Sequence, residues 1–348
     1  MKRRLLIRAD GNAKIGIGHI MRSMTIATAF KNHGFECFYV SSSPVNREIF
    51  ERYGFSVTEV NYPYDQKTMT EAEELCRFIQ KKSVGFVLID GYYIGNDYFS
   101  LLRRYAAVIC INSTKKKLAA DFVINENIAA DREYFDALYA ESGTKLLLGT
   151  EYTPVRQEFS QIDYNISSKV NNVLITTGGG DQYNFMTKFL KRIKKEAKYA
   201  QLHFTFISGA CNDYYEELCR AAYEIPNVTI LRDVVNMSEV MGSADLAIST
   251  GGTTVLELAA VGVPTIGMAV AADQEAGLNF MHNIGMLKFA GKITDEDFWD
   301  RLFVYFDKLL ADAKMRQNIH AKGRHLIDGK GAERIFREVV RGRQYGNR

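Results

Sequence analysis

Short hydrophobic runs alternate with amphipathic stretches along the first part of the chain. The runs at residues 5–7, 37–40, 86–89, 108–111 and 122–124 have the length and continuous apolar character of buried strands. Between them, apolar positions recur at helical spacing, as at Ile20, Met24 and Ala27. This alternation predicts a doubly wound parallel sheet that extends to about residue 148.

A second alternation follows a more polar stretch at 149–172 that contains Pro154. Its strand-like runs are residues 173–175, 204–207, 228–231, 246–248 and 265–266. After Gly291 the pattern is helical to the end, and the apolar spacing of Trp299, Leu302, Phe303 and Phe306 predicts a buried helix face. We expect an α/β protein with two Rossmann-like domains, residues 1–160 and residues 161–348, the second ending in helices.

Composition and charge narrow the class of protein. The chain has 348 residues, enough for two domains, and its 47% hydrophobic and 24% charged residues are those of a globular protein. A net charge of +3 is too small to indicate a nucleic-acid partner. We expect the lysine-rich segments at 115–117 and 191–195 to form solvated faces.

Cysteine usage and the N-terminus point to the cytoplasm. The five cysteines are odd in number and form no C-x-x-C pair, so we expect reduced core residues and no disulfide or zinc site. The apolar run behind the basic N-terminus ends at Arg8, which is too short for a signal peptide. No later run has the length of a membrane span.

A glycine loop, Gly16-Ile17-Gly18-His19, joins the first predicted strand to the first predicted helix. Glycines there allow a ligand to approach the backbone, and a helix N-terminus favours negative charge. Residues 21–23 lack the third glycine of the dinucleotide fingerprint, which argues against an NAD site. By itself, His19 could be a structural hydrogen-bonder or a functional group.

Two loops of the second half have a similar strand, glycine, helix pattern. The segment 249–254 combines Gly251 and Gly252 with threonine hydroxyls, a combination suited to a diphosphate. Glu257, one turn later, either grips ribose hydroxyls or complements the helix dipole. The other loop, 177–181, has three consecutive glycines that indicate a closely packed ligand, whereas its Asp181 could be only a helix cap.

These loops together resemble the UDP-2,4-diacetamido-2,4,6-trideoxy-β-L-altropyranose hydrolases of pseudaminic acid biosynthesis, a family that includes spore-coat polysaccharide proteins. The similarity covers about residues 1–290. It is carried by residues 8–11, 16–23, 89–92, 148–152, 156–159, 178–181, 249–264 and 273–275. The resemblance implies a GT-B-like fold, in which two Rossmann-like domains face each other across a cleft.

The resemblance also implies a reaction. The family hydrolyses a UDP-sugar, and His19 would be the base that activates water. With UDP leaving from the face opposite His19, we expect inversion, and helix-end amides near Thr253 and Thr254 could stabilise the leaving charge without metal or cofactor. Asp90 and Tyr92 would orient His19 or the sugar. The residues implied in substrate binding are Gly16, Gly18 and Arg22 in the first half, and Gly179, Gly180, Asp181, Asn184, Gly252, Thr253, Thr254, Glu257, Gln274 and Glu275 in the second.

The chain departs from the family pattern at two places, both in the sugar-binding half. Asp90-Gly91-Tyr92 stands where the family commonly has Asp-His-Tyr, and Asn112-Ser113-Thr114 where it commonly has Asp-Asp-Leu. Two other functions therefore remain open. The second-half loops also resemble those of UDP-sugar glycosyltransferases, in which His19 would deprotonate an acceptor hydroxyl, and a degenerate member could bind a nucleotide sugar without turnover.

Overall fold

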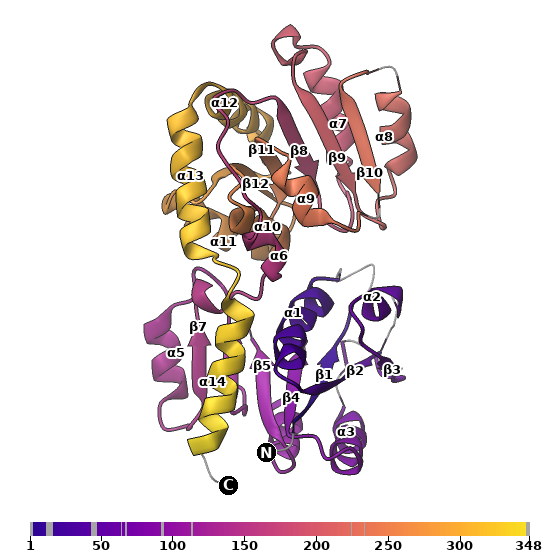
Figure 1. The fold of residues 1–348 in the computed structure, drawn as a ribbon, viewed down its shortest axis with the longest axis vertical. Helices are drawn as coiled ribbons and strands as arrows, with labels where there is room; N and C mark the ends of the chain where they lie inside the picture. The colour runs from indigo at the N-terminus through magenta and orange to yellow at the C-terminus, as the bar shows by residue number, and fades with distance from the viewer. Residues whose placement is uncertain are drawn as a thin grey trace. The chain divides into compact units, whose positions relative to one another are not determined.

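The computed structural model describes residues 3–11, 17–42, 47–63, 65–66, 68–91, 94–112, 114–223, 225–232 and 234–345, with side chains to residue 342. Two compact units divide the chain (Figure 1). The first comprises Met1–Pro154 and Lys330–Arg348, and the second comprises Val155–Gly329.

The first unit contains a seven-stranded parallel sheet in the order β3-β2-β1-β4-β5-β6-β7. Its strands are β1 (Arg4–Ala9), β2 (Glu36–Ser41), β3 (Val57–Glu59), β4 (Phe86–Asp90), β5 (Ala107–Ile111), β6 (Phe122–Asn125) and β7 (Lys145–Leu148). Every run that was predicted as a strand in this half is one. The pattern missed β3 and β7, because β3 has only three residues and β7 begins with an exposed lysine.

Helices cover both faces of this sheet and bury two apolar cores. They are α1 (Gly18–Asn32), α2 (Arg47–Arg52), α3 (Met69–Lys81), α4 (Asn96–Leu102), α5 (Arg132–Tyr139) and α14 (Gly331–Tyr345), with a 3-10 turn η1 (Thr150–Tyr152). The core on the α1 face receives alternate residues of β1, Leu5 and Ile7, and the core on the other face receives Leu6. Alternation along a strand produces this division.

The last helix, α14, corrects the predicted domain division. We expected the terminal helices in a second domain that began at residue 161, but α14 belongs to the first unit, which otherwise ends at Pro154. Its residues Ile335, Phe336 and Val339 are buried in the core beside α1. There, the ring of Phe336 lies 5.0 Å from that of Phe30. The apolar face of α14 therefore completes the first core.

The second unit contains a six-stranded parallel sheet in the order β10-β9-β8-β11-β12-β13. Its strands are β8 (Asn172–Thr176), β9 (His203–Ser208), β10 (Val228–Arg232), β11 (Leu246–Thr250), β12 (Thr265–Ala269) and β13 (Lys288–Lys292). The five predicted runs are strands. β13 was not predicted, because lysines at both of its ends and Gly291 within it weaken the apolar signal.

Helices of the second unit complete its core. They are α6 (Gln157–Ser160), α7 (Phe185–Ile193), α8 (Tyr215–Ala222), α9 (Met237–Gly242), α10 (Thr253–Val261), α11 (Ala272–Asn283), α12 (Phe298–Ala311) and α13 (Ala313–Leu326), with a 3-10 turn η2 (Ala197–Tyr199). The predicted stripe on α12 is a packing face. Leu302 and Phe306 are fully buried, and the Trp299 ring stacks 5.5 Å from Phe185.

The cysteine prediction is right in part. All five cysteines have free thiols. Cys76 and Cys110 are buried and Cys37 and Cys219 are half-buried, but Cys211 is exposed, which contradicts the expectation that all five lie in the core. The reason is that β9 ends at Ser208, so Cys211 falls in the turn that follows.

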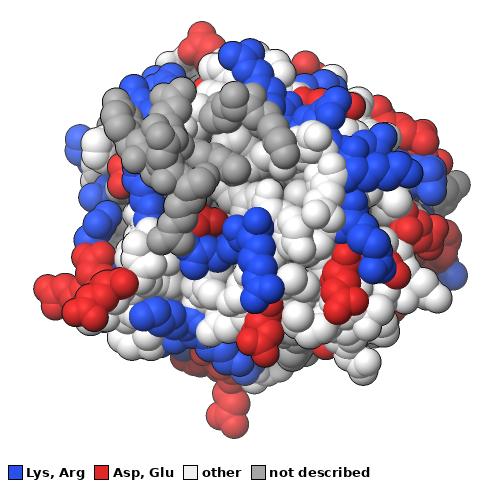
Figure 2. All heavy atoms as spheres, turned by 90° about the horizontal axis from the view of Figure 1, so that it is seen from below, with Lys and Arg blue, Asp and Glu red and all other residues white. Residues whose placement is uncertain are grey.

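Surface charge, metal-ligand geometry and helix hydropathy add three observations. On the face drawn in Figure 2, Lys and Arg are interspersed with Asp and Glu. Within the described ranges, no group of three or more His, Cys, Asp and Glu side chains is arranged to hold a metal ion. A search of the same residues finds no helix with the length and apolar character needed to cross a bilayer.

In each sheet, the chain changes the direction in which it adds strands beside the first strand of that sheet. β1 lies between β2 and β4, and β8 lies between β9 and β11, so the chain winds outward in both directions from these strands. In doubly wound sheets, ligands bind at the carboxyl ends of the strands on either side of such a switch point. The relevant loops are those after β1 and β4 in the first unit, and those after β8 and β11 in the second.

Candidate active site

His19 and Asp90 come from the two strand ends that flank the switch point of the first unit. Asp90 is the last residue of β4 and pairs in register with Ala9 of β1. His19 lies in the first turn of α1, which follows β1. The Nδ1 atom of His19 is 2.7 Å from Oδ1 of Asp90, and both side chains are buried. The strand order thus unites residues that are 71 positions apart in sequence.

Arg22, one turn further along α1, also binds Asp90. Its Nε donates to Oδ2 at 2.6 Å and its Nη2 donates to Oδ1 at 2.6 Å, a bidentate arrangement. The Nη1 atom donates to Oε1 of Glu126 at 2.8 Å. Arg22 was expected to bind substrate. In the structure its guanidinium binds Asp90 and Glu126.

Asp90 is ionised at neutral pH. Burial by itself would raise the pKa of this carboxyl group, but the charges and hydrogen bonds of Arg22 and His19 outweigh burial and lower the pKa to about 2. A permanent negative charge therefore lies against the imidazole of His19.

That charge selects the tautomer of His19. The Nδ1 atom lies near both the Asp90 carboxylate and Nη2 of Arg22, which is 3.0 Å away. A carboxylate accepts hydrogen bonds and would require a proton on Nδ1, whereas a guanidinium only donates them and would require a lone pair there. With Asp90 ionised and 2.7 Å away, we assign the proton to Nδ1, donated to Asp90. The ring lone pair is then on Nε2.

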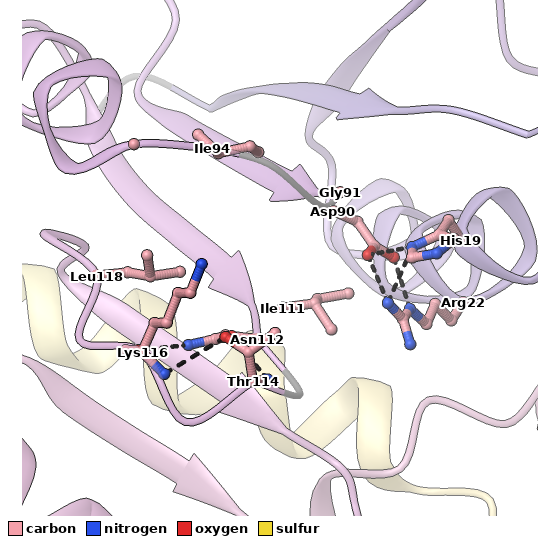
Figure 3. Close-up of a pocket in the computed structure, with 11 residues that line it drawn as sticks. His19, Arg22, Asp90, Gly91, Ile94, Ile111, Asn112, Thr114, Lys116 and Leu118 are labelled. Carbon is pink, nitrogen blue, oxygen red and sulfur yellow. Dashed lines mark hydrogen bonds and ion pairs between the residues drawn. The ribbon is translucent and has the colours of Figure 1, made fainter. Parts of the chain in front are cut away.

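A cavity of about 400 Å³ opens beside this cluster (Figure 3). Its lining combines His19, Arg22 and Asp90 with side chains that follow β4 and β5. The lining residues are His19, Arg22, Asp90, Gly91, Ile94, Gly95, Ile111, Asn112, Thr114, Lys116 and Leu118. A pocket with an apolar wall and a few convergent polar groups is the usual form of a small-molecule site.

The other expected residues of this half are only partly placed. Gly16 and Tyr92 lie outside the described residues. Gly18 is the first residue of α1, and an added Cβ there would meet no atom of the described residues within 4 Å. Glu126, Lys116 and the apolar wall were not identified from sequence. Glu126 and Lys116 are single residues that follow β6 and β5, with no motif to mark them.

Asn112, one of the departures from the family pattern, is a structural residue. Its Oδ1 accepts from the Thr114 amide at 2.9 Å and from the Thr114 hydroxyl at 2.7 Å. Its Nδ2 donates to the Lys116 carbonyl at 3.0 Å. The amide side chain is thus occupied in shaping the loop after β5.

In the second unit, the N-terminus of α10 has no side-chain cap among the described residues. The helix begins at Thr253, no side chain caps it, and its first turn carries no acidic residue. The preceding Gly252 has φ of +114°, a conformation that favours glycine. Uncapped amides at a helix start can bind phosphate, so Thr253 and Thr254 remain the residues expected to contact it.

The loop after β8 differs, because its helix start is already capped. The buried Asp181 accepts from the amides of Phe185 and Met186 at 2.7 and 2.9 Å. Asn184 has left-handed backbone geometry and donates through Nδ2 to Glu217 at 2.8 Å. These contacts favour the capping alternative for Asp181. Of the glycines before it, Gly179 is the open one, because an added Cβ at Gly180 would lie 3.1 Å from the Cys211 carbonyl oxygen.

The remaining expected residues make contacts of their own. Glu257 lies in α10, where its Oε1 is 3.4 Å from Nη2 of Arg156. Burial raises the pKa of Glu257 and the Arg156 charge opposes that shift. Gln274 accepts from the Val270 amide at 3.0 Å and donates to the Gly251 carbonyl. Glu275 pairs with the half-buried Lys292 at 3.6 Å. Gln274 therefore ties the loop after β12 to the loop that begins α10.

Comparison with known proteins first defines the class. Residues 172–281 match the model of the glycosyltransferase family 28 C-terminal domain, and this segment includes the loops after β8, β11 and β12. MurG of Acinetobacter baumannii, a solved structure, has a TM-score of 0.65 with 16% identity over 94% of this chain and 99% of its own. The two α/β units thus have the GT-B-like fold predicted from sequence.

Two proteins with similar sequences add to this comparison. The spore coat polysaccharide biosynthesis protein SpsG of Bacillus subtilis is 23% identical over 94% of this chain and 95% of its own length. The UDP-2,4-diacetamido-2,4,6-trideoxy-beta-L-altropyranose hydrolase of Campylobacter jejuni is 22% identical over 73% of this chain and 87% of its own. The family resemblance inferred from the glycine loops is confirmed.

Proposed function

We propose that this protein is an inverting, metal-independent hydrolase that splits a UDP-linked sugar into UDP and free sugar during polysaccharide or nonulosonic acid biosynthesis. The coarser function, processing of a UDP-sugar, is supported by both relatives and by the family 28 domain match. The hydrolytic step rests mainly on one observation, the pairing of His19 with an ionised Asp90 beside a cavity.

His19 would act as the general base. Its Nε2 takes a proton from water as the water oxygen attacks the anomeric carbon. The bond between that carbon and the β-phosphate oxygen breaks, and UDP leaves from the opposite face with the bonding electrons. Asp90, as a positioning residue, stabilises the imidazolium that forms and keeps the ring oriented, while Arg22 fixes Asp90.

UDP would be held by the second unit. The uncapped start of α10, with Thr253 and Thr254, would receive the diphosphate and stabilise its charge as it leaves. Glu257, placed by Arg156, would accept hydrogen bonds from ribose hydroxyls. Gly179 and Gly180 would allow the nucleotide to approach the backbone, and Gln274 would hold the loop in front of α10.

The sugar proposed is a 6-deoxy-diacetamido sugar, as in the name of the Campylobacter relative. The apolar side chains of Ile94, Ile111 and Leu118 in the cavity suit the methyl groups of such a sugar. This assignment places the reaction in a pathway of the pseudaminic acid type.

Glycosyl transfer is the second candidate. The family 28 C-terminal domain match and the MurG-like fold favour it, because glycosyl transfer can use the same UDP-sugar as its donor. In this case His19 would deprotonate an acceptor hydroxyl in place of water.

One assay separates the two reactions. Purified protein is incubated with UDP-2,4-diacetamido-2,4,6-trideoxy-β-L-altropyranose and EDTA without an acceptor, and UDP and free sugar are measured. We expect both products in equal amounts. Binding of UDP without product, followed by turnover when an acceptor is added, would establish the transferase reaction, and loss of turnover in EDTA would contradict metal independence.

A further inference from the structure

Glu126 contacts Arg22 from a strand end two strands away from that of Asp90. In the sheet, Asp90 pairs in register with Ile111 of β5, and Ile111 pairs with Ile124 of β6. Ile124 belongs to the core on the α1 face, and Glu126, two residues further on, continues that face by alternation. Its Oε1 accepts a hydrogen bond from Nη1 of Arg22 at 2.8 Å. One arginine of α1 thus joins two carboxylates from different strand ends.

The backbone beside Glu126 is fixed, and its side chain is mostly buried. The Gly149 amide donates to the Asn125 carbonyl at 2.8 Å, and the Asn127 amide donates to the Asn125 side chain at 3.0 Å. Only 13% of the Glu126 side chain and 15% of the Arg22 side chain are exposed. Charges that are this far removed from water are weakly screened, so the Glu126 carboxylate acts strongly on its neighbours.

The second oxygen of Glu126 shows that its charge is matched by Arg22 alone. Among the residues that the structure describes, Oε2 is buried and has no hydrogen-bond partner. A buried carboxylate oxygen without a partner costs free energy, and a neutral amide at the same place would accept from Arg22 at a lower cost. The hydrogen bond by itself therefore does not explain a glutamate here. What the carboxylate adds is a negative charge.

That charge changes the balance of the His19 cluster. With neutral His19, the single positive charge of Arg22 faces the two carboxylates of Asp90 and Glu126, which leaves one negative charge in excess. A proton on His19 makes the cluster neutral. Without the Glu126 charge, the same proton would leave the cluster positive, with the imidazolium ring 3.0 Å from Nη2 of Arg22. Glu126 therefore favours the protonated form of His19.

The neighbouring titratable groups do not supply this charge. Burial raises the pKa of the Tyr39 hydroxyl on β2 and of the Cys110 thiol on β5, so both groups stay protonated and neutral near pH 7. Lys116 lines the cavity, but it is exposed and water screens its charge. None of these three side chains contributes a negative charge to the cluster.

The charged groups on the elements that pack around α1 belong to other contacts. Arg8 alternates with the core residues of β1, which places it on the opposite face of the sheet, where it pairs with Asp10 and Glu71. On α14, Glu333 pairs with the histidine that follows the last residue of α1, at the other end of that helix from His19. Within the described ranges, Glu126 is thus the second carboxylate that acts on Arg22.

We propose that Glu126 is a positioning residue for the His19 base: its charge offsets that of Arg22 and leaves the Asp90 carboxylate free to stabilise the imidazolium. Glu126 acts through Arg22 and does not line the cavity, so it does not bind the sugar. The inference rests on the proposed function, in which His19 takes a proton, and it applies to water and to an acceptor hydroxyl alike.

Three variants separate the charge of Glu126 from its shape. Glu126→Gln keeps an oxygen that can accept from Arg22 and removes the charge, whereas Glu126→Asp keeps the charge. Glu36→Gln is the matched control, because Glu36 pairs with Arg4 at the start of β1, away from the strand ends that carry the site. Thermal unfolding shows whether each variant is folded.

Protonation of His19 is measured without substrate by NMR of the imidazole nitrogens, with His19→Gln to identify the signals. The pH at which half of His19 is protonated should fall by about 0.5 or more in Glu126→Gln, roughly a threefold loss of proton affinity. It should stay close to the wild-type value in Glu126→Asp and Glu36→Gln. An unchanged midpoint in Glu126→Gln would overturn the inference, as would an equal fall in Glu126→Asp, because shape would then matter and charge would not.

The pH profile of UDP release gives a second measurement. In Glu126→Gln, the acidic limb of kcat/KM should move to lower pH by the same amount, and kcat on the plateau should fall severalfold because a weaker base removes the proton. A lower plateau with an unmoved acidic limb would indicate a structural role and contradict the inference. Absence of turnover with the UDP-sugar would contradict the proposed function, and the NMR titration would still decide whether Glu126 controls the protonation of His19.

Discussion

The Nδ1 atom of His19 lies 2.7 Å from Oδ1 of Asp90, and the two residues belong to neighbouring strand ends of one parallel sheet. Arg22 holds the same carboxylate through two further hydrogen bonds. An ionised carboxylate that an arginine fixes through both oxygens can hold a histidine ring in one orientation. This contact is the basis of the mechanism proposed for the first unit.

Replacing the acid should impair catalysis and spare nucleotide binding. In Asp90→Asn, the negative charge that stabilises the imidazolium is lost, and the Arg22 guanidinium keeps only Glu126 as an ionic partner. We expect kcat for UDP release to fall about 100-fold or more. Calorimetric titration with UDP is the control, because the α10 site lies in the second unit. A variant with near wild-type kcat would show that Asp90 does not support His19.

Stability should depend on pH through the same carboxyl group. The pKa of Asp90 lies below its ordinary value of 3.8, at about 2, so the folded state gains stability from it above pH 4 and loses this gain as the pH falls toward 2. At 1.36 kcal/mol per pKa unit, the gain is about 2 kcal/mol.

Urea unfolding of wild type and Asp90→Asn at pH 7, 4 and 3 measures this effect. The difference in unfolding free energy should be largest at pH 7 and should shrink below pH 4. A difference that is independent of pH would mean that the Asp90 charge makes no net contribution to stability.

Glu257 should make the nucleotide site selective for ribose. If its carboxylate accepts from a ribose hydroxyl, wild type should bind UDP about tenfold tighter than 2′-deoxy-UDP, since a hydrogen bond to a charged group contributes roughly 1.5–3 kcal/mol. Glu257→Ala should lose this preference, and Arg156→Gln should weaken it because Arg156 places the carboxylate. If Glu257→Ala still prefers UDP over 2′-deoxy-UDP, Glu257 does not contact the ribose and only pairs with Arg156.

Two variants in the loop after β8 should affect ligand binding and stability separately. An added Cβ at Gly179 would meet no atom within 4 Å, so Gly179→Ala should change stability by less than about 0.5 kcal/mol and lower UDP affinity severalfold. Asp181→Ala removes the cap of α7 and should cost about 1 kcal/mol or more of stability. Thermal unfolding and UDP titration of both variants measure the two effects. Unchanged UDP affinity in Gly179→Ala would mean that no ligand packs against this glycine.

Sequence pattern was sufficient where one local signal determines the structure. Continuous apolar runs correctly predicted ten strands, and the glycine loop before His19 marked the start of α1. The pattern missed β3, β7 and β13, because a short or lysine-bounded edge strand has no continuous apolar run. It also placed α14 in the wrong unit, since an amphipathic helix does not indicate which core it will cover.

In the candidate site, the sequence indicated some of the residues but not the contacts that they make. Sequence resemblance singled out His19 and Asp90, but only the strand order shows that they touch. Glu126 and Lys116 belong to no motif, and their proximity to the cavity depends on how the chain returns after β5 and β6. For Asp181, a carboxylate before a helix was compatible with a cap or a ligand contact, and only the hydrogen bonds to α7 favour the cap.

The most direct test of the central claim compares wild type with His19→Ala and His19→Gln in UDP release from UDP-2,4-diacetamido-2,4,6-trideoxy-β-L-altropyranose, with no acceptor and with EDTA present. UDP affinity is measured in parallel to show that the second unit is intact. General-base catalysis predicts that both variants bind UDP normally and lose at least about 100-fold in kcat. Near wild-type release of UDP by either variant would contradict the assignment of His19 as the base.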